Sequence, residues 1–322
     1  MMIAIPEKRT QGTRAFYERK YQQLATQAGE KFGLQKGVVV PPNLILQHLL
    51  ARRSTLSKRT WQVYKSAFVA QMESFAAQTK DPAESQVFLQ MAYEMGKEGQ
   101  SEARPRGVQG ASLKGRRVRQ EDHQRLIQYL IGRFADDKWA KVTKLVCEAS
   151  YLTGLRPGEW VDAWVEHEGG TGPLLSVRNA KQTHGRGNGE RRTLDLSALS
   201  PDEVGLIEEM TLYARGSEEP WSQVQRKVAD YLYASVQKAF GRRKCYLSLY
   251  SYRHQFSADA KATWKKAEVA ALMGHGSDET AGRNYARALV GTRGRSRVKP
   301  VAAEVARVRQ VAKPRPPKPK AQ

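Results

Sequence analysis

The chain changes character at Thr-Gly-Leu-Arg-Pro-Gly-Glu-Trp, residues 153–160, where a helical pattern gives way to short strands. Gly154 is suited to ending the helix in a left-handed conformation, and Pro157 prevents the helix from resuming at once. Arg156 is therefore expected on a tight turn, where its guanidinium is held away from its own helix and can present a rigid fork to a phosphate. Glu159, three residues later, is placed to hold that guanidinium. A surface arginine beside a turn is the simpler interpretation of the same residues.

The segments on either side of this turn predict a mixed α+β unit. Before it, apolar residues at i, i+3 and i+4 predict helices over about 119–133 and 136–153. After it, apolar runs near 174–177 and 193–196 read as two strands, and the Gly-rich stretch between them is suited to a hairpin turn. Helical spacing then returns in later segments, at about 201–214, 222–240, 252–263 and 265–273. The predicted fold is mainly α with a small antiparallel β-hairpin or sheet.

The first part of the chain predicts a separate, all-helical unit. Helical spacing recurs in segments at about 10–34, 43–53, 58–78 and after Asp81-Pro82. A stretch of Gly, Ser, Pro and Arg follows with little apolar periodicity, and this composition indicates an extended basic linker. The predicted organisation is a helical extension, a helical domain, a linker, a larger α+β domain and a basic tail, over 1–40, 41–97, 98–115, 116–290 and 291–322.

Composition excludes several classes of protein and favours one that binds nucleic acid. The chain has 322 residues, 40% of them hydrophobic, with 54 Lys and Arg against 32 Asp and Glu and a net charge of +22. So large a surplus favours a polyanion such as nucleic acid, because each neutralised phosphate releases counterions. Two cysteines exclude a disulfide framework or a zinc module, and the apolar stretches are too short to cross a bilayer. A cytoplasmic, nucleoid-associated protein without a membrane partner is expected.

Further candidates for chemistry lie in the last third of the chain. Tyr250 and Arg253 stand at i and i+3, on one face of a predicted helix. His275 lies between two glycines, and Tyr285 is expected on the helix that follows. Taken singly, His275 reads as a turn residue and Tyr285 as one more half-buried ring. Their order along the chain is more informative.

Taken in order, these residues resemble the signature of the tyrosine recombinase (phage integrase) family, Arg…Lys…His-x-x-Arg…Gly-His…Tyr. The resemblance covers roughly 111–288 by motif, and it covers the helical domain before it only by arrangement. It implies a helical core-binding (SAM-like) domain and a catalytic domain that form a C-shaped clamp on DNA. By the same resemblance the catalytic residues are Arg156, Lys181, Tyr250, Arg253, His275 and Tyr285, with Glu159 and His254 in support.

The chain departs from this signature where Tyr250 stands in place of the usual histidine. A phenol can donate a hydrogen bond to a phosphate oxygen, but it cannot take up a proton near neutral pH as imidazole can. His254 is a poor replacement, because it lies about 100° round the helix from Arg253. The match of Lys181 is less specific, since the same hairpin holds Arg186, Arg191 and Arg192.

The resemblance implies that DNA is cleaved and rejoined without a metal, ATP or another cofactor. The two arginines, with His275 and Tyr250, would stabilise charge on the scissile phosphate. Tyr285 would attack to form a 3′-phosphotyrosine link, and Lys181 would protonate the 5′-hydroxyl leaving group. Strands would be exchanged two at a time through a Holliday junction. The implied partners are a double-stranded recombination site, a homotetramer on two sites with a dimer on each, and an accessory DNA-binding protein.

Basic residues outside these positions are candidates for contacts with DNA. They are Arg52, Arg53, Lys58, Arg59, Lys65, Arg104, Arg106, Arg186, Arg191, Arg226, Lys227, Arg242 and Arg243. The predicted helix at 222–240 fits a major groove and a solvated face equally well. Near the end of the chain an apolar stripe at helical spacing is formed by Val301, Val305, Val308 and Val311. The resemblance implies a helix here that docks into a neighbouring protomer, and the composition also fits a frayed basic tail.

Other functions stay open on these grounds. A type IB topoisomerase-like or telomere-resolvase-like enzyme uses similar residues, and a catalytically silent architectural DNA-binding protein would carry the same charge. The alternatives to Tyr285 as nucleophile are Tyr246, Tyr250 and Tyr252. The biological role expected of a recombinase here is resolution of transposon cointegrates or integration and excision of a mobile element.

Overall fold

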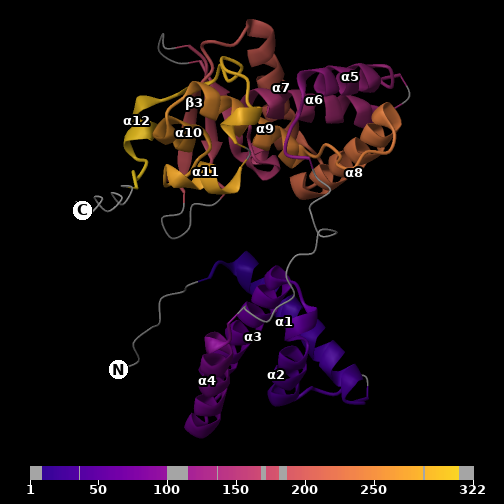
Figure 1. Cartoon of the computed structure of the whole chain (residues 1–322), viewed down its shortest axis with the longest axis vertical. Coiled ribbons are helices and arrows are strands. Elements are labelled where there is room, and N and C mark those ends of the chain that lie inside the picture. Colours follow the sequence, from indigo (N-terminus) through magenta and orange to yellow (C-terminus); the bar gives the residue numbers. More distant parts are fainter. Residues whose placement is uncertain are drawn as a thin grey trace, which may run out of the picture. The chain divides into compact units, whose positions relative to one another are not determined.

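The computed structural model describes residues 9–35, 37–99, 115–135, 137–167, 172–180, 187–285 and 287–311. Contacts divide the chain into two compact units, Met1–Ala111 and Ser112–Gln322, and each is described by itself (Figure 1). They are called the N-terminal unit and the C-terminal unit below. Most of the predicted linker, 98–115, lies outside the described residues.

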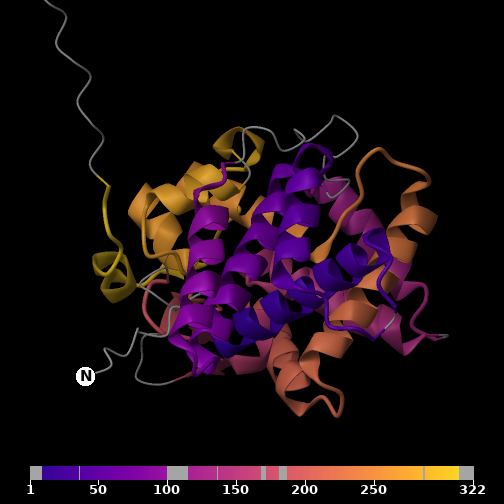
Figure 2. The same cartoon turned by 90° about the horizontal axis from the view of Figure 1, so that it is seen from below.

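The N-terminal unit is built from helices that begin at capping residues. Its α-helices within the described ranges are α1 (Gln11–Lys31), α2 (Pro42–Ala51), α3 (Lys58–Gln78) and α4 (Pro82–Lys97). The side chains of Thr10, Ser57 and Asp81 accept hydrogen bonds from the first turns of α1, α3 and α4. α3 packs against both α1 and α4 (Figure 2). Trp61 and Phe68 of α3 are completely buried in the core that results.

The C-terminal unit is also mainly helical. Its longer helices are α5 (Gln120–Ile131), α6 (Lys138–Thr153), α7 (Pro201–Gly216), α8 (Trp221–Phe240) and α9 (Leu249–Thr263). Its shorter ones are α10 (Lys266–Leu272), α11 (Glu279–Asn284), α12 (Ala302–Ala306) and the 3-10 turns η3 (Pro157–Asp162) and η5 (Ala288–Val290). Among the described residues, no helix of either unit is long and apolar enough to span a bilayer.

Helix α9 lies deep within this unit and carries side chains of the site. From Leu249 to Ala260 every residue is buried except Tyr250 and His254. α9 packs against α6, and the close approach is made at Gly154, where a Cβ atom would lie 2.3 Å from Cδ1 of Phe256. Gly154 also has φ +63°, the left-handed conformation expected of it.

A small antiparallel sheet stands beside the helices, with strand order β1-β2-β3-β4 within the described part of the chain. The strands are β1 (Ala163–Glu166), β2 (Leu174–Arg178), β3 (Arg191–Asp195) and β4 (Lys299–Pro300). Leu175 pairs with Leu194, and Leu194 pairs in turn with Pro300. The predicted class, mainly helical with a small antiparallel sheet, is confirmed. Sequence analysis missed β1 and β4, because four and two residues are too few for an alternating pattern to be recognised.

The segment after β4 folds onto its own unit. The predicted helix along the valine stripe is only five residues long, α12, and Val311 is 42% exposed. Val308 is buried with Ala270 and Ala271 of α10, which lies between α12 and β3 (Figure 1). The interpretation as a frayed tail is therefore wrong up to Val311. Residues 312–322 lie outside the described ranges.

Candidate active site

Arg156 is presented by the turn that ends α6. Gly154 closes the helix, and the turn η3 begins with Pro157, so the intervening Arg156 adopts an extended conformation with φ −68°. Its Nη1 donates to Oε1 of Glu159 at 2.5 Å, and its backbone N–H donates to Oε2 of the same carboxylate at 2.9 Å. Glu159 thus holds both the backbone and the side chain of Arg156, as the spacing predicts.

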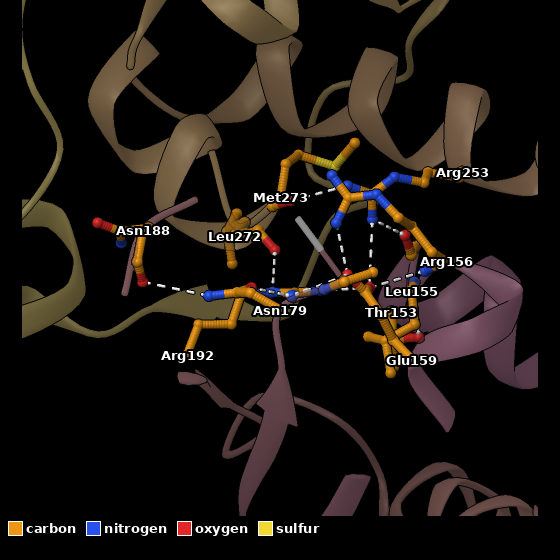
Figure 3. Close-up of polar contacts among 12 residues, drawn as sticks. Thr153, Leu155, Arg156, Glu159, Asn179, Asn188, Arg192, Arg253, Leu272 and Met273 are labelled. Carbon is orange, nitrogen blue, oxygen red and sulfur yellow. Dashed lines mark hydrogen bonds and ion pairs between the residues drawn. The ribbon is translucent and has the colours of Figure 1, made fainter. Parts of the chain in front are cut away.

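Arg253 reaches the same place from α9, and its side chain is completely buried. Its Nη1 donates to the carbonyl of Gly154 at 2.6 Å, and its Nη2 donates to the carbonyl of Met273 at 2.7 Å. Its Nε donates to the hydroxyl of Tyr285 at 3.1 Å. Arg156 and Arg253, which are far apart in sequence, therefore meet at one place (Figure 3), and Tyr285 joins them through its bond to Arg253.

The carboxylate of Glu159 is shared by three arginines (Figure 3). It lies 2.5 Å from Arg156, 2.9 Å from Arg192 and 3.8 Å from Arg253. Burial raises the pKa of Glu159, but the three guanidinium groups outweigh it, and the net pKa lies well below the ordinary value. In the described part of this cluster three positive charges face one negative charge. The cluster therefore has a surplus of two positive charges suited to an anion.

His275 is held by the turn that follows α10. Its backbone N–H donates to the carbonyl of Ala270 at 2.8 Å, after Gly274 in the left-handed conformation at φ +65°. Burial, together with the nearby Arg253, lowers the pKa of His275 to about 2, so its imidazole is neutral at pH 7. Its Nδ1 is buried and has no hydrogen-bond partner among the described residues.

Tyr285 lies one residue beyond the end of α11, and the expectation that it stands within a helix is wrong by this residue. Its ring stacks on His275 at a centroid distance of 5.4 Å and contacts His254 at 5.2 Å. Burial raises the pKa of the phenol, but the charges of Arg253 and Arg156 lower it to a net value below the ordinary one. The neighbouring guanidinium groups therefore make the phenol easier to ionise than a free tyrosine.

Tyr250 and His254 are the two residues between Leu249 and Ala260 of α9 that are not buried. Tyr250 is 41% exposed and lies at the rim of the cluster, near Arg156. The resemblance implies a supporting role for His254, and its ring contacts that of Tyr285 although it lies about 100° round the helix from Arg253. Burial, helped by Arg116 and Arg253, lowers the pKa of His254 to about 4.

Lys181 lies outside the described residues, as does Arg186 of the same loop. The described chain ends just before it, at Ala180. The backbone N–H of Ala180 donates to Oε1 of Glu159 at 3.4 Å. The segment that follows β2 is therefore anchored at the arginine cluster through Ala180, the last residue described before Lys181.

Arg192 is a residue of this cluster that sequence analysis did not assign to the site. It is completely buried and bonds Glu159, Asn179 and the carbonyl of Leu272. The alternating pattern of β3 could have identified Arg192 from the sequence. In β3 the inward positions are Arg192 and Leu194, and an arginine at a core position of an alternating strand needs a buried partner.

Of the other tyrosines considered as nucleophiles, Tyr250 lies at the rim of the cluster, and Tyr246 and Tyr252 lie outside it. Tyr252 is fully buried, and burial with the neighbouring Cys147 raises its pKa well above the ordinary value. Tyr246 packs edge-on against Tyr233. Among the described residues no three His, Cys, Asp or Glu side chains gather as a metal site would require.

The expected DNA-contacting residues fall into three groups. Exposed are Lys58, Arg59, Arg226, Lys227, Arg242 and Arg243, of which Lys227 pairs with Glu219 and Arg243 with Asp122. Bonded within the fold are Arg52 to Gln27, Arg53 to Glu98, Lys65 to the carbonyls of Gly96 and Glu98, and Arg191 to Ser176 and the carbonyl of Asp162. Outside the described ranges are Arg104, Arg106 and Arg186.

The sequence matches no protein-family model and no curated protein. The structure is similar to that of a XerH site-specific recombinase bound to difH substrate, with 16% sequence identity and a TM-score of 0.47, over 84% of this chain and 75% of that one. It is similar to lambda integrase in a tetramer bound to a Holliday junction, with 16% identity and a TM-score of 0.46, over 87% and 73% of the two chains. For XerA recombinase the identity is 13% and the TM-score 0.35, over 84% and 92%.

Proposed function

We propose that this protein is a tyrosine-type site-specific DNA recombinase. One observation carries the proposal: the hydroxyl of Tyr285 lies 3.1 Å from Nε of Arg253, beside Arg156, with a surplus of positive charge around it. A phosphodiester and an attacking phenolate each bring one negative charge. The two uncompensated positive charges of the cluster match that sum, and charge placed in advance is commonly the largest catalytic contribution.

The proposed reaction is a phosphoryl transfer from DNA to Tyr285. The phenolic oxygen attacks the scissile phosphorus, a 3′-phosphotyrosine bond forms, and the bond to the 5′ oxygen breaks. Lys181 gives a proton to that oxygen, which leaves as a hydroxyl. Arg156, Arg253 and the neutral His275 donate to the phosphate oxygens, with Tyr250 as a further donor from the rim. The ester bond is conserved in the intermediate, so rejoining needs no ATP, and the arginines supply the charge that metal ions supply in many other phosphoryl transfers.

The proposal extends to strand exchange. Protomers would act as a tetramer on two duplex sites, a dimer on each, and exchange two strands at a time through a Holliday junction. The exposed basic residues Lys58, Arg59, Arg226 and Arg242 would contact DNA phosphates, which set the register of the protein on the duplex. The biological setting would be cointegrate resolution or movement of a genetic element in the nucleoid, with an accessory DNA-binding protein.

A nicked suicide substrate tests the covalent step. The protein should become trapped on DNA that contains its site, and Tyr285→Phe should abolish trapping because it removes the attacking oxygen. Tyr246→Phe is the matched control, since it removes a phenol that lies outside the cluster. Trapping that persists in Tyr285→Phe would contradict the assignment of the nucleophile.

Binding without any trapped product would instead indicate a silent architectural protein. A plasmid with two target sites separates the remaining enzymes. Deletion or inversion of the intervening DNA is expected of a recombinase, whereas a type IB topoisomerase-like enzyme would only relax the plasmid. A telomere-resolvase-like enzyme would leave hairpin ends.

A further inference from the structure

Arg192 is a buried arginine that belongs to no step of the reaction above. Its side chain is 0% exposed, and its bonds go to Glu159, Asn179 and Leu272, whereas Arg253 is the arginine that bonds the hydroxyl of Tyr285. Its Nη2 donates to Oε2 of Glu159 at 2.9 Å, and its Nη1 donates to Oδ1 of Asn179 at 2.5 Å. Its Nε donates to the carbonyl of Leu272 at 3.2 Å. A buried charge with this many directed bonds holds several segments in one arrangement (Figure 3).

Arg192 and Arg253 hold the same turn from two sides. Arg192 bonds the carbonyl of Leu272, and Arg253 bonds the carbonyl of Met273, the next residue. His275 follows two residues later. The turn also packs directly on Arg192, because a Cβ atom at Gly274 would lie 2.8 Å from its Nη1. Arg192 therefore contacts the turn that carries His275.

Asn179 extends this hold to the β2–β3 hairpin. Its Nδ2 donates to the carbonyl of Asn188 at 3.2 Å and to that of Gly189 at 3.0 Å, while its Oδ1 accepts from Arg192. The two sides of the hairpin are thus tied together beside the arginine cluster. Asn188 in turn donates to the carbonyl of Glu304 at 2.8 Å.

Arg192 also determines how Glu159 is shared. Arg192 lies 2.9 Å from Oε2 of Glu159, whereas Arg253 lies 3.8 Å from the same oxygen. Arg253 directs its bonds to two carbonyls and to Tyr285 instead. Without Arg192, the carboxylate would be free to close onto Arg253 and draw its guanidinium away from the tyrosine.

We propose that Arg192 is a positioning residue for the strand-cleavage reaction: through Glu159 and the turn before His275, it holds Arg156, Arg253 and His275 in the geometry that surrounds the hydroxyl of Tyr285. The inference rests on the proposed function. It assigns Arg192 no contact with DNA, so its loss should affect the rate of the covalent step and not the affinity for DNA.

The first experiment measures trapping on the suicide substrate at saturating DNA. Arg192→Met should slow formation of the covalent product about 100-fold, since misplacement of about 1 Å costs that much. The dissociation constant for DNA should stay within about 2-fold of the wild-type value, because only the chemical step is affected. Arg192→Lys, which keeps the charge and one bond, should recover about 10-fold of the loss.

The matched control is Arg178→Met in the neighbouring strand β2. Arg178 forms ion pairs with Asp162 and Glu190 at the surface, so its loss should leave the trapping rate of bound complexes unchanged. Thermal unfolding of each variant is recorded beside the rate, so that every rate refers to folded protein. If Arg192→Met does not fold, Arg192→Lys provides the comparison.

A double-mutant cycle with Glu159→Gln separates positioning from a general structural role. If Arg192 acts through Glu159, adding Arg192→Met to Glu159→Gln should cost much less than it does in the wild type. Equal, multiplicative losses in the two backgrounds would overturn the inference, and so would a folded Arg192→Met or Arg192→Lys that cleaves at the wild-type rate. Absence of any trapped product with wild-type protein would instead defeat the proposed function, and this inference with it.

Discussion

At the scale of single residues, Glu159 connects the parts of the candidate site. Its spacing from Arg156 predicts one contact, and the structure adds Arg192 from β3 and Arg253 from α9. The added contacts could not be predicted from spacing, because their partners lie 33 and 94 positions away in the chain. The carboxylate therefore stabilises the fold as well as orienting the arginines.

Replacement of Glu159 by Gln should destabilise the protein. Three buried guanidinium groups would lose their shared counter-charge, and breaking buried ion pairs in this way costs about 3–5 kcal/mol. The measurement is the free energy of unfolding in urea at pH 7. Glu203→Gln is the control: Glu203 pairs with Arg297 near the surface, and Gln keeps the helix-capping pattern, so the loss should be about 1 kcal/mol or less.

The same pair of variants gives a pH dependence. The pKa of Glu159 in the folded protein lies well below its ordinary value of 4.5, so its contribution is complete above pH 4.5 and is lost as the pH falls towards the folded value. The wild type should therefore lose stability faster than Glu159→Gln does below about pH 4.5. Parallel curves for the two proteins would contradict the assigned pKa.

At the scale of elements, the longer helices and the strands β2 and β3 were predictable, and β1 and β4 were not. Apolar spacing places α6, α7 and α8 correctly, since each buries one stripe against a core. The strand β4 is two residues long and forms only because the chain returns to Leu194 and Asp195 of β3. The local sequence around β4 does not indicate that pairing. The end of a short helix is equally hard to predict from apolar spacing, and Tyr285 was expected within α11 although that helix of six residues ends just before it.

The junction of α6 and α9 gives a prediction about Gly154. Alanine there would need a left-handed conformation, with its Cβ 2.3 Å from the ring of Phe256. The expected destabilisation is about 3 kcal/mol, from backbone strain and overpacking together. Gly205→Ala in α7 is the control, because open space surrounds that Cβ, and alanine should stabilise the helix by about 1 kcal/mol. The measurement is the thermal unfolding midpoint of each variant, which should fall for Gly154→Ala and rise for Gly205→Ala.

At the scale of the whole molecule, the net charge of +22 is divided between internal bonds and the surface. The side chain of Lys65 donates to backbone carbonyls, and Arg191 lies over the ring of Trp164. Lys58 and Arg226 are exposed. Composition predicts a polyanionic partner, but only the structure separates the cations that stabilise the fold from those that can meet a phosphate.

Salt dependence of DNA binding tests that division. The replacements Lys58→Ala and Arg226→Ala should each reduce the slope of log K against log salt by about 0.9, because each removes one neutralised phosphate. Lys144→Ala serves as the control, since Lys144 is paired with Glu148 within α6. A slope that stays at the wild-type value in the first two variants would remove these residues from the interface.

The sequence by itself determined the helical character of both units, the antiparallel hairpin and the order of candidate residues, because these depend on periodicity and on turn residues close together in the chain. The tertiary structure alone decided which side chains share Glu159, that Arg192 belongs to the cluster, and that His254 lies against Tyr285. The physical reason is that burial and charge act through space. A guanidinium stabilises a carboxylate or a phenolate at a distance of a few ångströms, whatever the number of residues between them.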